Sequence, residues 1–312
     1  MPTTARLFLA LLMTGAMLSA SPAGAQGNPE SVRREILRRI NEERAKSGSP
    51  LLRLLDPLNS TAQQHAEEIS RQGTLRLTKG TEDVLGERLK KLGYDVHAWT
   101  ESVTAGTGDL DTVLRNWKSQ DSGTYKSLMD DDFRDLGIGL STLRGAPLYV
   151  FLFAVPQAEY FTRTTAPLRD PARVRAAMLE QVNAARRKAG APPLRANPLL
   201  DKAAQKHAED MLARGYFAHE SPGGGTVRER AKEAGYDWHE IGENIAEGQF
   251  TVGDVMNGWL KSPGHQRNIV NRGFSELGTG IVAARSKDGQ YRVLWVQAFG
   301  TLDAPKTAPK KK

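Results

Sequence analysis

"DPARVRAAMLEQVNAARRKAGAP", residues 170–192, decides the fold, because an earlier stretch of the same chain repeats its pattern. That stretch is "NPESVRREILRRINEERAKSGSP", residues 28–50, and its capping residue, proline, asparagine and glycine recur at one constant offset. A capping residue followed by proline is typical of a helix N-terminus. The register continues through "HAEEISRQG" and "HAEDMLARG", and through Trp117 and Trp259. The chain is therefore one unit present twice.

The repeat organises most of the chain. We define copy one as residues 26–158 and copy two as residues 170–303, each of ordinary domain size. A polar linker that contains proline and threonine, residues 159–169, joins them. The last residues, 304–312, are rich in lysine and proline and have no apolar partners, so we expect a disordered basic tail.

The N-terminus has the three parts of a secretory signal peptide. Arg6 supplies a positive region, residues 7–20 form an uncharged apolar run, and Ala23-Gly24-Ala25 is a small-x-small cleavage signal. This pattern predicts removal of residues 1–25 and a soluble protein outside the cytoplasm, in the periplasm or the extracellular space. No other run approaches the ~20 apolar residues of a membrane span.

Composition narrows the chemistry further. The chain has no cysteine, which excludes disulfides, a lipobox anchor and thiolate catalysis. Its formal charge is +7, and part of that charge lies in the tail, for which anionic cell-envelope polymers are possible partners. No alternation of basic and aromatic residues indicates a nucleic-acid partner.

Each copy places helices first and strands later. In copy two, Val174, Met178 and Val182 recur with the period of a helix, and a later helix over 252–260 buries Trp259. The segments "LGTGIVAA" and "YRVLWVQAF" read as strands joined by the hairpin turn "SKDGQ". We therefore predict an α/β fold of two tandem αβα sandwiches, each with a small, mostly antiparallel sheet flanked by helices.

Three motifs of copy two follow one another: "YFAHESPGGG", "IGENIAEG" and "WLKSPGHQRNIV", before a closing "WVQAFG". With them, copy two resembles the CAP superfamily (cysteine-rich secretory, antigen 5 and pathogenesis-related-1 proteins), above all its bacterial SCP-like extracellular members. The resemblance implies a sandwich with a central cleft, where two histidines and acidic residues can bind a divalent metal. By motif, these residues are His219, Glu243 and His265.

The residue types alone support the same three metal ligands, but less strongly than the motifs do. Two imidazoles and a carboxylate suit Zn²⁺ with an open coordination position. Ser262-Pro263 predicts a helix start with Ser262 as the cap, which places His265 in the first turn. There the positive end of the helix dipole favours a neutral imidazole. Many family members carry a second glutamate where this chain has Ser262, so the resemblance implies a weaker metal site.

The other polar residues of copy two have ordinary interpretations. His207 recurs as His65, which favours a structural histidine at the edge of the core. Ser221 lacks the G-x-S-x-G motif of a serine hydrolase. We expect a loop position for His239, solvated carboxylates at Glu240 and Glu247, and a flexible cleft rim, not a phosphate loop, at Gly223-Gly224-Gly225.

Copy one lacks most of the motif residues. Leu77 stands for His219, Gly123 or Thr124 for His265, and Val155 for Gln297, whereas Glu101 matches Glu243. This internal comparison predicts that copy one keeps the fold without the site.

The sequence thus indicates a secreted bacterial CAP protein that binds an extracellular ligand in copy two. The ligand class stays open among lipid-like molecules, cell-envelope polymers and proteins. One alternative is a metal-dependent hydrolase or protease in which His219, Glu243 and His265 surround a metal-bound water. Another is a purely structural envelope protein that binds through its tail. Turnover of a substrate would select the hydrolase, and ligand binding without turnover would select the binding protein. A protein that is unaffected by the loss of both histidines would be the structural one.

Overall fold

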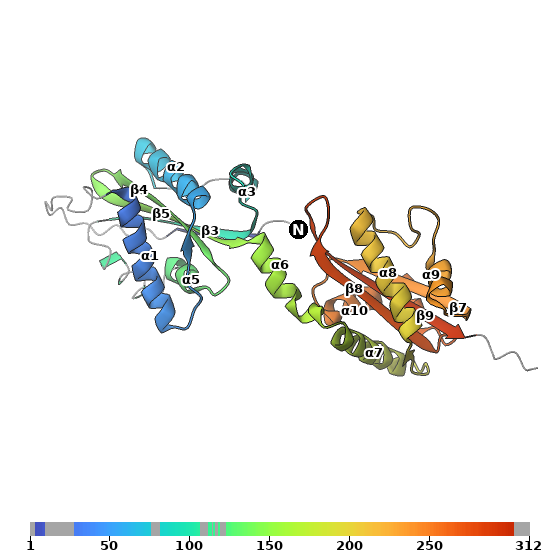
Figure 1. Cartoon of the computed structure of the whole chain (residues 1–312). Helices are drawn as coiled ribbons and strands as arrows, with labels where there is room; N and C mark the ends of the chain where they lie inside the picture. The colour runs from blue at the N-terminus through green and yellow to red at the C-terminus, as the bar shows by residue number, and fades with distance from the viewer. Residues whose placement is uncertain are drawn as a thin grey trace, which may run out of the picture. The chain divides into compact units, whose positions relative to one another are not determined.

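The computed structural model describes residues 4–9, 28–75, 82–106 and 123–302, together with residues 112, 113, 115 and 118. The chain divides into two compact units, Met1–Tyr160 and Phe161–Lys312, which hold copy one and copy two (Figure 1). The predicted cleavage site, Leu77 and the basic tail lie outside the described residues. Among the residues that are described, no helix is long and apolar enough to cross a membrane.

The second unit is built on a four-stranded sheet with the strand order β6-β8-β9-β7. Strands β7 and β8 run antiparallel to β9, and the short β6 runs parallel to β8. The strands are β6 (Arg195–Ala196), β7 (Trp238–Glu247), β8 (Glu276–Arg285) and β9 (Tyr291–Leu302). The helices are α7 (Pro171–Lys188), α8 (Pro198–Arg214), α9 (Val227–Ala234), α10 (Val252–Lys261) and α11 (Pro263–Val270). The predicted small, mostly antiparallel sheet flanked by helices is confirmed.

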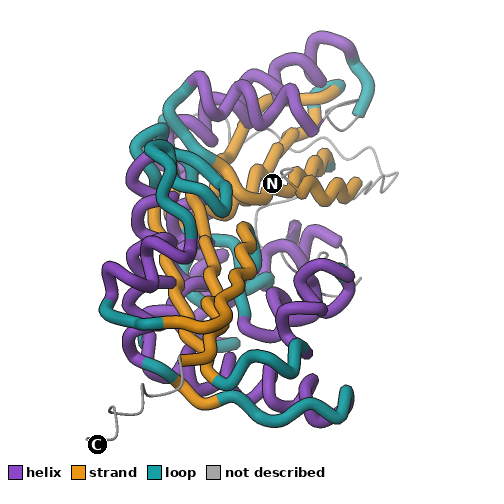
Figure 2. The backbone as a smooth tube through the Cα atoms, turned by 90° about the vertical axis from the view of Figure 1, so that its right-hand side faces the viewer, coloured by secondary structure: helices purple, strands orange, loops and turns teal. Residues whose placement is uncertain are grey.

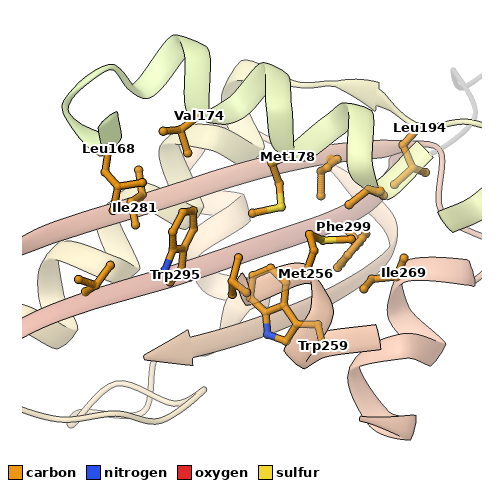
Figure 3. Close-up of a cluster of buried hydrophobic side chains, with 14 of the residues drawn as sticks. Leu168, Val174, Met178, Leu194, Met256, Trp259, Ile269, Ile281, Trp295 and Phe299 are labelled. Atoms are coloured by element: carbon orange, nitrogen blue, oxygen red, sulfur yellow. The ribbon is translucent and has the colours of Figure 1, made fainter. Parts of the chain in front are cut away.

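Each face of this sheet carries its own core. Helices α8 and α9 pack on one face, against Leu294 and Val296 of β9. Helices α7, α10 and α11 pack on the other face, against Trp295 and Phe299 (Figure 3). Successive side chains of β9 enter opposite cores because the side chains of a strand alternate between its two faces. Trp259 is 2% exposed within the second core, which confirms its predicted structural role.

The first unit repeats this plan. Its sheet has the order β1-β3-β5-β4-β2, and Figure 2 shows the strands of each unit with helices beside them. Its strands are β1 (Thr4–Leu9), β2 (Arg53–Leu54), β3 (Val96–Ala105), β4 (Asp135–Leu143) and β5 (Ala146–Pro156). Its helices are α1 (Pro29–Lys46), α2 (Asp56–Gln72), α3 (Glu82–Lys91) and α5 (Gly123–Met129). Strand β1, which pairs in parallel with β3, lies inside the predicted signal peptide and has no counterpart in the sheet of the second unit.

Two glycines per copy allow a helix to lie directly on the sheet. A Cβ atom on Gly278 would lie 2.1 Å from the backbone of Leu200, and one on Gly280 would lie 2.3 Å from that of Ala204. In copy one, Gly137 and Gly139 meet the backbone of α2 at 2.3 and 2.1 Å. The repeated Gly-x-Gly is therefore a packing requirement of the fold.

Asn28 and Asp170 cap their helices as expected. Asn197 caps α8 in the same way, whereas α2 of copy one has Leu55 at the cap position and no side-chain cap bond. The predicted linker, residues 159–169, is mostly helical, with α6 (Gln157–Thr165) and a 3₁₀ turn, η1 (Ala166–Arg169). Phe161 of α6 is buried in the core of the second unit.

Candidate functional site

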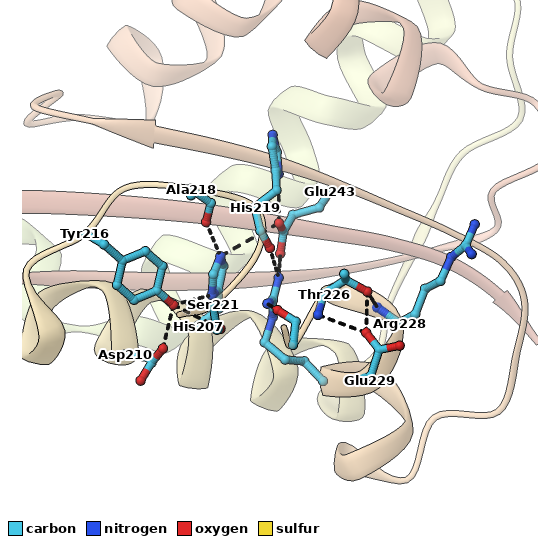
Figure 4. Close-up of polar contacts among 12 residues, drawn as sticks. His207, Asp210, Tyr216, Ala218, His219, Ser221, Thr226, Arg228, Glu229 and Glu243 are labelled. Atoms are coloured by element: carbon cyan, nitrogen blue, oxygen red, sulfur yellow. Dashed lines mark hydrogen bonds and ion pairs between the residues drawn. The ribbon is translucent and has the colours of Figure 1, made fainter. Parts of the chain in front are cut away.

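Glu243 lies at the centre of a polar cluster in copy two. It sits in the middle of β7, and its side chain is only 3% exposed. Oε1 of Glu243 accepts from Nδ1 of His219 at 2.9 Å, and Oε2 accepts from Nη2 of Arg230 at 2.6 Å. Figure 4 shows His219 and His207 near this carboxylate. Both oxygens of Glu243 are therefore engaged by other side chains.

His219 is the accessible member of the cluster. It lies in the loop between α8 and α9, and its side chain is 58% exposed. A carboxylate can only accept, so Nδ1 of His219 carries a hydrogen, and in the neutral ring Nε2 keeps its lone pair. His219 and Glu243, which the motifs assign to one site, are in direct contact, and the carboxylate orients the ring.

His207 lies deeper than the sequence indicated. It is fully buried on α8, and its Nε2 is 3.8 Å from Oε1 of Glu243 and 3.0 Å from the carbonyl oxygen of Ala218. Burial lowers the pKa of His207, although the negative charge of Glu243 acts in the opposite direction. Its neutral ring therefore holds the residue that precedes His219. The prediction placed His207 at the edge of the core, so it underestimated the burial, and it missed the proximity to Glu243.

His265 is fixed by side-chain amides, and the predicted serine cap is wrong. Ser262 occupies the cap position of α11, but its side chain makes no capping hydrogen bond. Instead, Nδ2 of Asn244 donates to the carbonyl oxygen of His265 at 3.2 Å. Nδ2 of Asn268 donates to Oδ1 of Asn244 at 2.9 Å and to the carbonyl oxygen of Glu243 at 3.0 Å. These bonds attach the first turn of α11 to β7.

Gln297 of β9 extends this amide network. It is fully buried on β9, and its Oε1 accepts from Nδ2 of Asn244 at 3.0 Å. Its Nε2 lies 3.1 Å from the sulfur of Met178 and 3.5 Å from that of Met256. In the sequence, Gln297 is only one residue of the closing motif, whereas its strand pairing with Asn244 explains its role.

The ring of His265 lies within electrostatic range of His219. Burial lowers the pKa of His265, and the nearby positive charge that His219 carries when protonated lowers it further. A neutral His265 is therefore favoured at physiological pH. The structure thus brings His219 and Glu243 into contact and places His265 within electrostatic range of His219.

The donor set fits a metal ion only in part. The described residues contain no group of three or more histidine, cysteine, aspartate or glutamate side chains arranged to hold one. Glu243 uses both oxygens for His219 and Arg230, so two imidazoles, those of His219 and His265, are the available ligands. A metal-binding histidine usually donates its other nitrogen to a carboxylate, which is what His219 does. Glu243 therefore fits the role of orienting a ligand better than that of being one.

Other candidates take structural roles. Oγ of Ser221 lies 3.0 Å from the hydroxyl of Tyr216, which also donates to Asp210, and no imidazole is positioned to activate the serine among the residues described. His239 lies in β7, not in a loop, and is exposed. The carboxylates expected to be solvated are paired: Glu240 accepts from Asn271 at 2.6 Å and Glu247 from Arg292 at 2.6 Å.

Copy one keeps only the inner part of the cluster. Nδ1 of His65 lies 2.6 Å from Oε1 of Glu101, and both side chains are buried. By strand pairing, Ser102 takes the place of Asn244 and Phe151 takes the place of Gln297. The predicted equivalence of Val155 and Gln297 is wrong, because the hairpin of copy two is longer and shifts the alignment of the last strand.

A cavity of about 390 Å³ lies elsewhere, along the outer side of α8. Its walls include Arg175, Asp201 and Lys206 and none of the predicted site residues. Asp201 and Gln205 accept from backbone N–H groups of β8 there, at 2.7 and 3.1 Å. This region covers a sheet edge and has no chemical link to the histidine cluster.

Comparison with protein families gives two matches within the chain. The model of the cysteine-rich secretory protein (CAP) family matches residues 37–153 and 179–299, one region in each copy. An uncharacterized protein of Bacillus subtilis, YkwD, is 34% identical over 142 residues, which cover 46% of this chain and 52% of that relative. The match therefore spans about half the length of that relative.

Two solved structures are similar at low identity. An outer surface protein from Borrelia burgdorferi is 22% identical and aligns with a TM-score of 0.36 over 41% of this chain and 92% of its own. An extracellular protein containing a SCP domain from Bacillus anthracis is also 22% identical, with a TM-score of 0.35 over 52% of this chain and 59% of its own.

Proposed function

Because the chain belongs to the cysteine-rich secretory protein (CAP) family and carries its domain twice, we propose that it is a secreted binding protein whose ligand site lies in copy two. The observation that carries this proposal is the Glu243–His219 hydrogen bond, which presents an oriented, exposed imidazole nitrogen. Copy one has a buried His65–Glu101 pair in place of that exposed group. Copy one then serves as a scaffold.

The proposed site is the surface around His219 and His265. His219 offers the lone pair of Nε2, and His265 is biased toward its neutral form by burial. Two neutral imidazoles can accept hydrogen bonds from a ligand or coordinate one divalent metal, Zn²⁺ being the best match to nitrogen ligands. A bound Zn²⁺ would supply a Lewis acid that polarises an oxygen of the ligand.

Calorimetric titration of the full chain with Zn²⁺ tests the site. We expect one equivalent per chain with modest affinity, because only two protein ligands are available. His219→Ala and His265→Ala should each weaken binding by at least about tenfold without a change in the unfolding midpoint. The matched control, His239→Ala, removes an exposed histidine of β7 and should bind like the wild type. Two equivalents, or undiminished binding by His265→Ala, would place the site elsewhere.

A metal-dependent hydrolase is the second candidate. A histidine oriented by a buried carboxylate is also the arrangement of a general base, which favours this alternative. Chromogenic peptide and ester substrates, assayed with and without Zn²⁺, separate the two functions. Binding of Zn²⁺ without turnover supports the binding protein, whereas turnover that disappears in His219→Ala would replace it with the hydrolase.

A further inference from the structure

We propose that Arg230, which the sequence motifs do not mark, is the positioning residue of the site in copy two: its guanidinium holds the His219 loop and Glu243 in one arrangement. The proposal deepens the proposed function, and only its ligand-binding readout rests on that function. Arg230 lies on α9 and is 6% exposed. A buried arginine is uncommon unless its donors are paired. In Arg230 both terminal nitrogens are paired, whereas Nε has no partner among the described residues, so the contacts of the terminal nitrogens identify its role.

Three acceptors from two parts of the chain meet at this guanidinium. Nη1 donates to the carbonyl oxygen of Gly225 at 2.8 Å, and Nη2 donates to that of His219 at 3.1 Å. Nη2 also donates to Oε2 of Glu243 at 2.6 Å. Arg230 therefore joins the loop that carries His219 to the strand that carries the carboxylate.

The two carbonyl groups lie at opposite ends of one short loop. Between His219 and Gly225, the backbone is closed by bonds from Ser221 to Gly225 at 2.8 Å and from Gly224 to Ser221 at 2.9 Å. One planar guanidinium thus holds both ends of a glycine-rich turn, in addition to the two backbone bonds within the turn. A lysine ammonium is a point charge and cannot reproduce this fixed fork of donors.

Arg230 is also the charge that balances Glu243. A buried carboxylate is costly unless it is paired, and the side chains of Arg230 and Glu243 are 6% and 3% exposed. His207 is too far away for a short hydrogen bond to Glu243, at 3.8 Å, and its Nε2 is close to Ala218. The pairing on Oε2 leaves Oε1 available as a pure acceptor for Nδ1 of His219.

The consequence is a defined tautomer on an exposed histidine. While Arg230 holds Oε2 and the loop, His219 donates through Nδ1 and presents the lone pair of Nε2 outward. Without Arg230, the carboxylate loses a partner and the loop loses both anchors. His219 then has no single preferred orientation, so both tautomers become populated.

Nitrogen NMR of the imidazoles in the metal-free, full-length protein tests this at one fixed neutral pH. We expect a single Nδ1–H tautomer for His219 in the wild type and a mixture in Arg230→Gln. Zn²⁺ affinity should fall by at least about tenfold in the same variant. Arg230→Lys should give an intermediate mixture. Arg228→Gln, on the same helix but with Arg228 over the ring of Trp238, and Arg88→Gln, at the equivalent position of copy one, should match the wild type.

The outcomes separate this proposal from the proposed function. A folded Arg230→Gln protein that keeps one Nδ1–H tautomer would overturn the role of Arg230. If that variant does not fold, Arg230→Lys decides, because a wild-type tautomer signal in it would show that the guanidinium is dispensable. A wild type that fails to bind Zn²⁺ would remove the proposed metal site and leave the tautomer test intact.

Discussion

The two copies differ most on the strand that crosses the middle of each sheet. In copy two, β9 carries Gln297, which supports Asn244 and through it the first turn of α11. In copy one, β5 carries Phe151 at the equivalent place, fully buried in an apolar core. Two paired strand positions, Asn244 and Gln297 in copy two and Ser102 and Phe151 in copy one, therefore separate a copy with an amide network from one without it. The difference teaches that fold and site depend on different residues of the same elements.

Residues shared by both copies serve the fold. The paired glycines of β4 and β8, the buried Arg44 and Arg186, and a pair of packed phenylalanines occur in each unit. Arg44 donates to carbonyl oxygens at the end of α5 and in the loop that follows it, and Arg186 does the same at the end of α11. A degenerate copy keeps these residues because losing one leaves buried backbone groups unpaired or a helix displaced.

Exchanging the residues of this central strand should give the largest effect. Phe151→Gln puts an unpaired amide into the core of copy one and should lower its free energy of unfolding by about 4 kcal/mol. Gln297→Phe removes the partner of Asn244 and crowds Met178 and Met256, for a loss of about 3 kcal/mol in copy two. Urea unfolding of the full chain measures both.

A conservative exchange provides the control for this comparison. Gln297→Glu keeps the shape but places a charge among apolar groups, so it should destabilise copy two as well. Phe151→Leu, by contrast, keeps the core of copy one apolar and should cost clearly less than Phe151→Gln. A Phe151→Gln protein as stable as the wild type would show that the two strands are not equivalent.

The repeated glycines should give the next largest effect, and it should be equal in the two copies. Gly278→Ala and Gly137→Ala each place a methyl group within about 2 Å of helix backbone, where no side-chain movement can relieve it. We expect a loss of about 2 to 3 kcal/mol for each in urea unfolding. Gly258→Ala and Gly86→Ala meet no atom within 4 Å and should be neutral or slightly stabilising. A large loss in only one copy would contradict the shared helix–sheet contact.

These outcomes bear on what the sequence could reveal. The repeat, the caps and the periodic apolar residues predicted both sheets and most helices, because those signals are local. The residues of the site were predicted by motif, but their contacts were not. His207 looked structural because its counterpart His65 is also a histidine on a helix, and Arg230 stood in a helix full of charges, "RERAKEA". Their approach to Glu243 depends on how α8, α9 and β7 pack, which no short pattern encodes.

The serine cap and the Val155 equivalence failed for related reasons. Ser262 has the residue type of a cap, and its carbonyl oxygen accepts the first helical bond from Gln266 at 2.8 Å, but its hydroxyl makes no capping hydrogen bond. Val155 was aligned by counting along the chain, whereas strand pairing fixes equivalence in space, and the two hairpins have different lengths. Residue type and spacing along the chain do not determine which partner a side chain meets.

Zn²⁺ affinity should depend on pH, and we expect this effect to be smaller than the losses of stability above. Ligating imidazoles must be neutral, so affinity should fall as the pH drops through about 6.5, by about tenfold for each unit and each imidazole. Burial and the charge of His219 lower the pKa of His265, so protonation of this ligand should contribute only at the lower end of the range. Calorimetry across pH measures the profile. His219→Leu, which introduces the residue of copy one, should leave weak binding, and a flat wild-type profile would exclude imidazole ligands.

The smallest expected effect concerns the fifth strand of copy one. Strand β1 pairs with β3 from Thr4 to Leu9, and these residues belong to the predicted signal peptide. We expect exported protein to begin at Gln26, within a few residues, and so to lack β1. Without β1, the sheet of copy one has the strand order of the four-stranded sheet of copy two, so four strands should be enough for copy one as well.

The free energy of unfolding of copy one should then differ by less than about 1 kcal/mol between chains that begin at Met1 and at Gln26. N-terminal sequencing and urea unfolding test this. Exported protein that retains Met1, or a copy one that unfolds without β1, would show that the first copy depends on a strand that the second does not need.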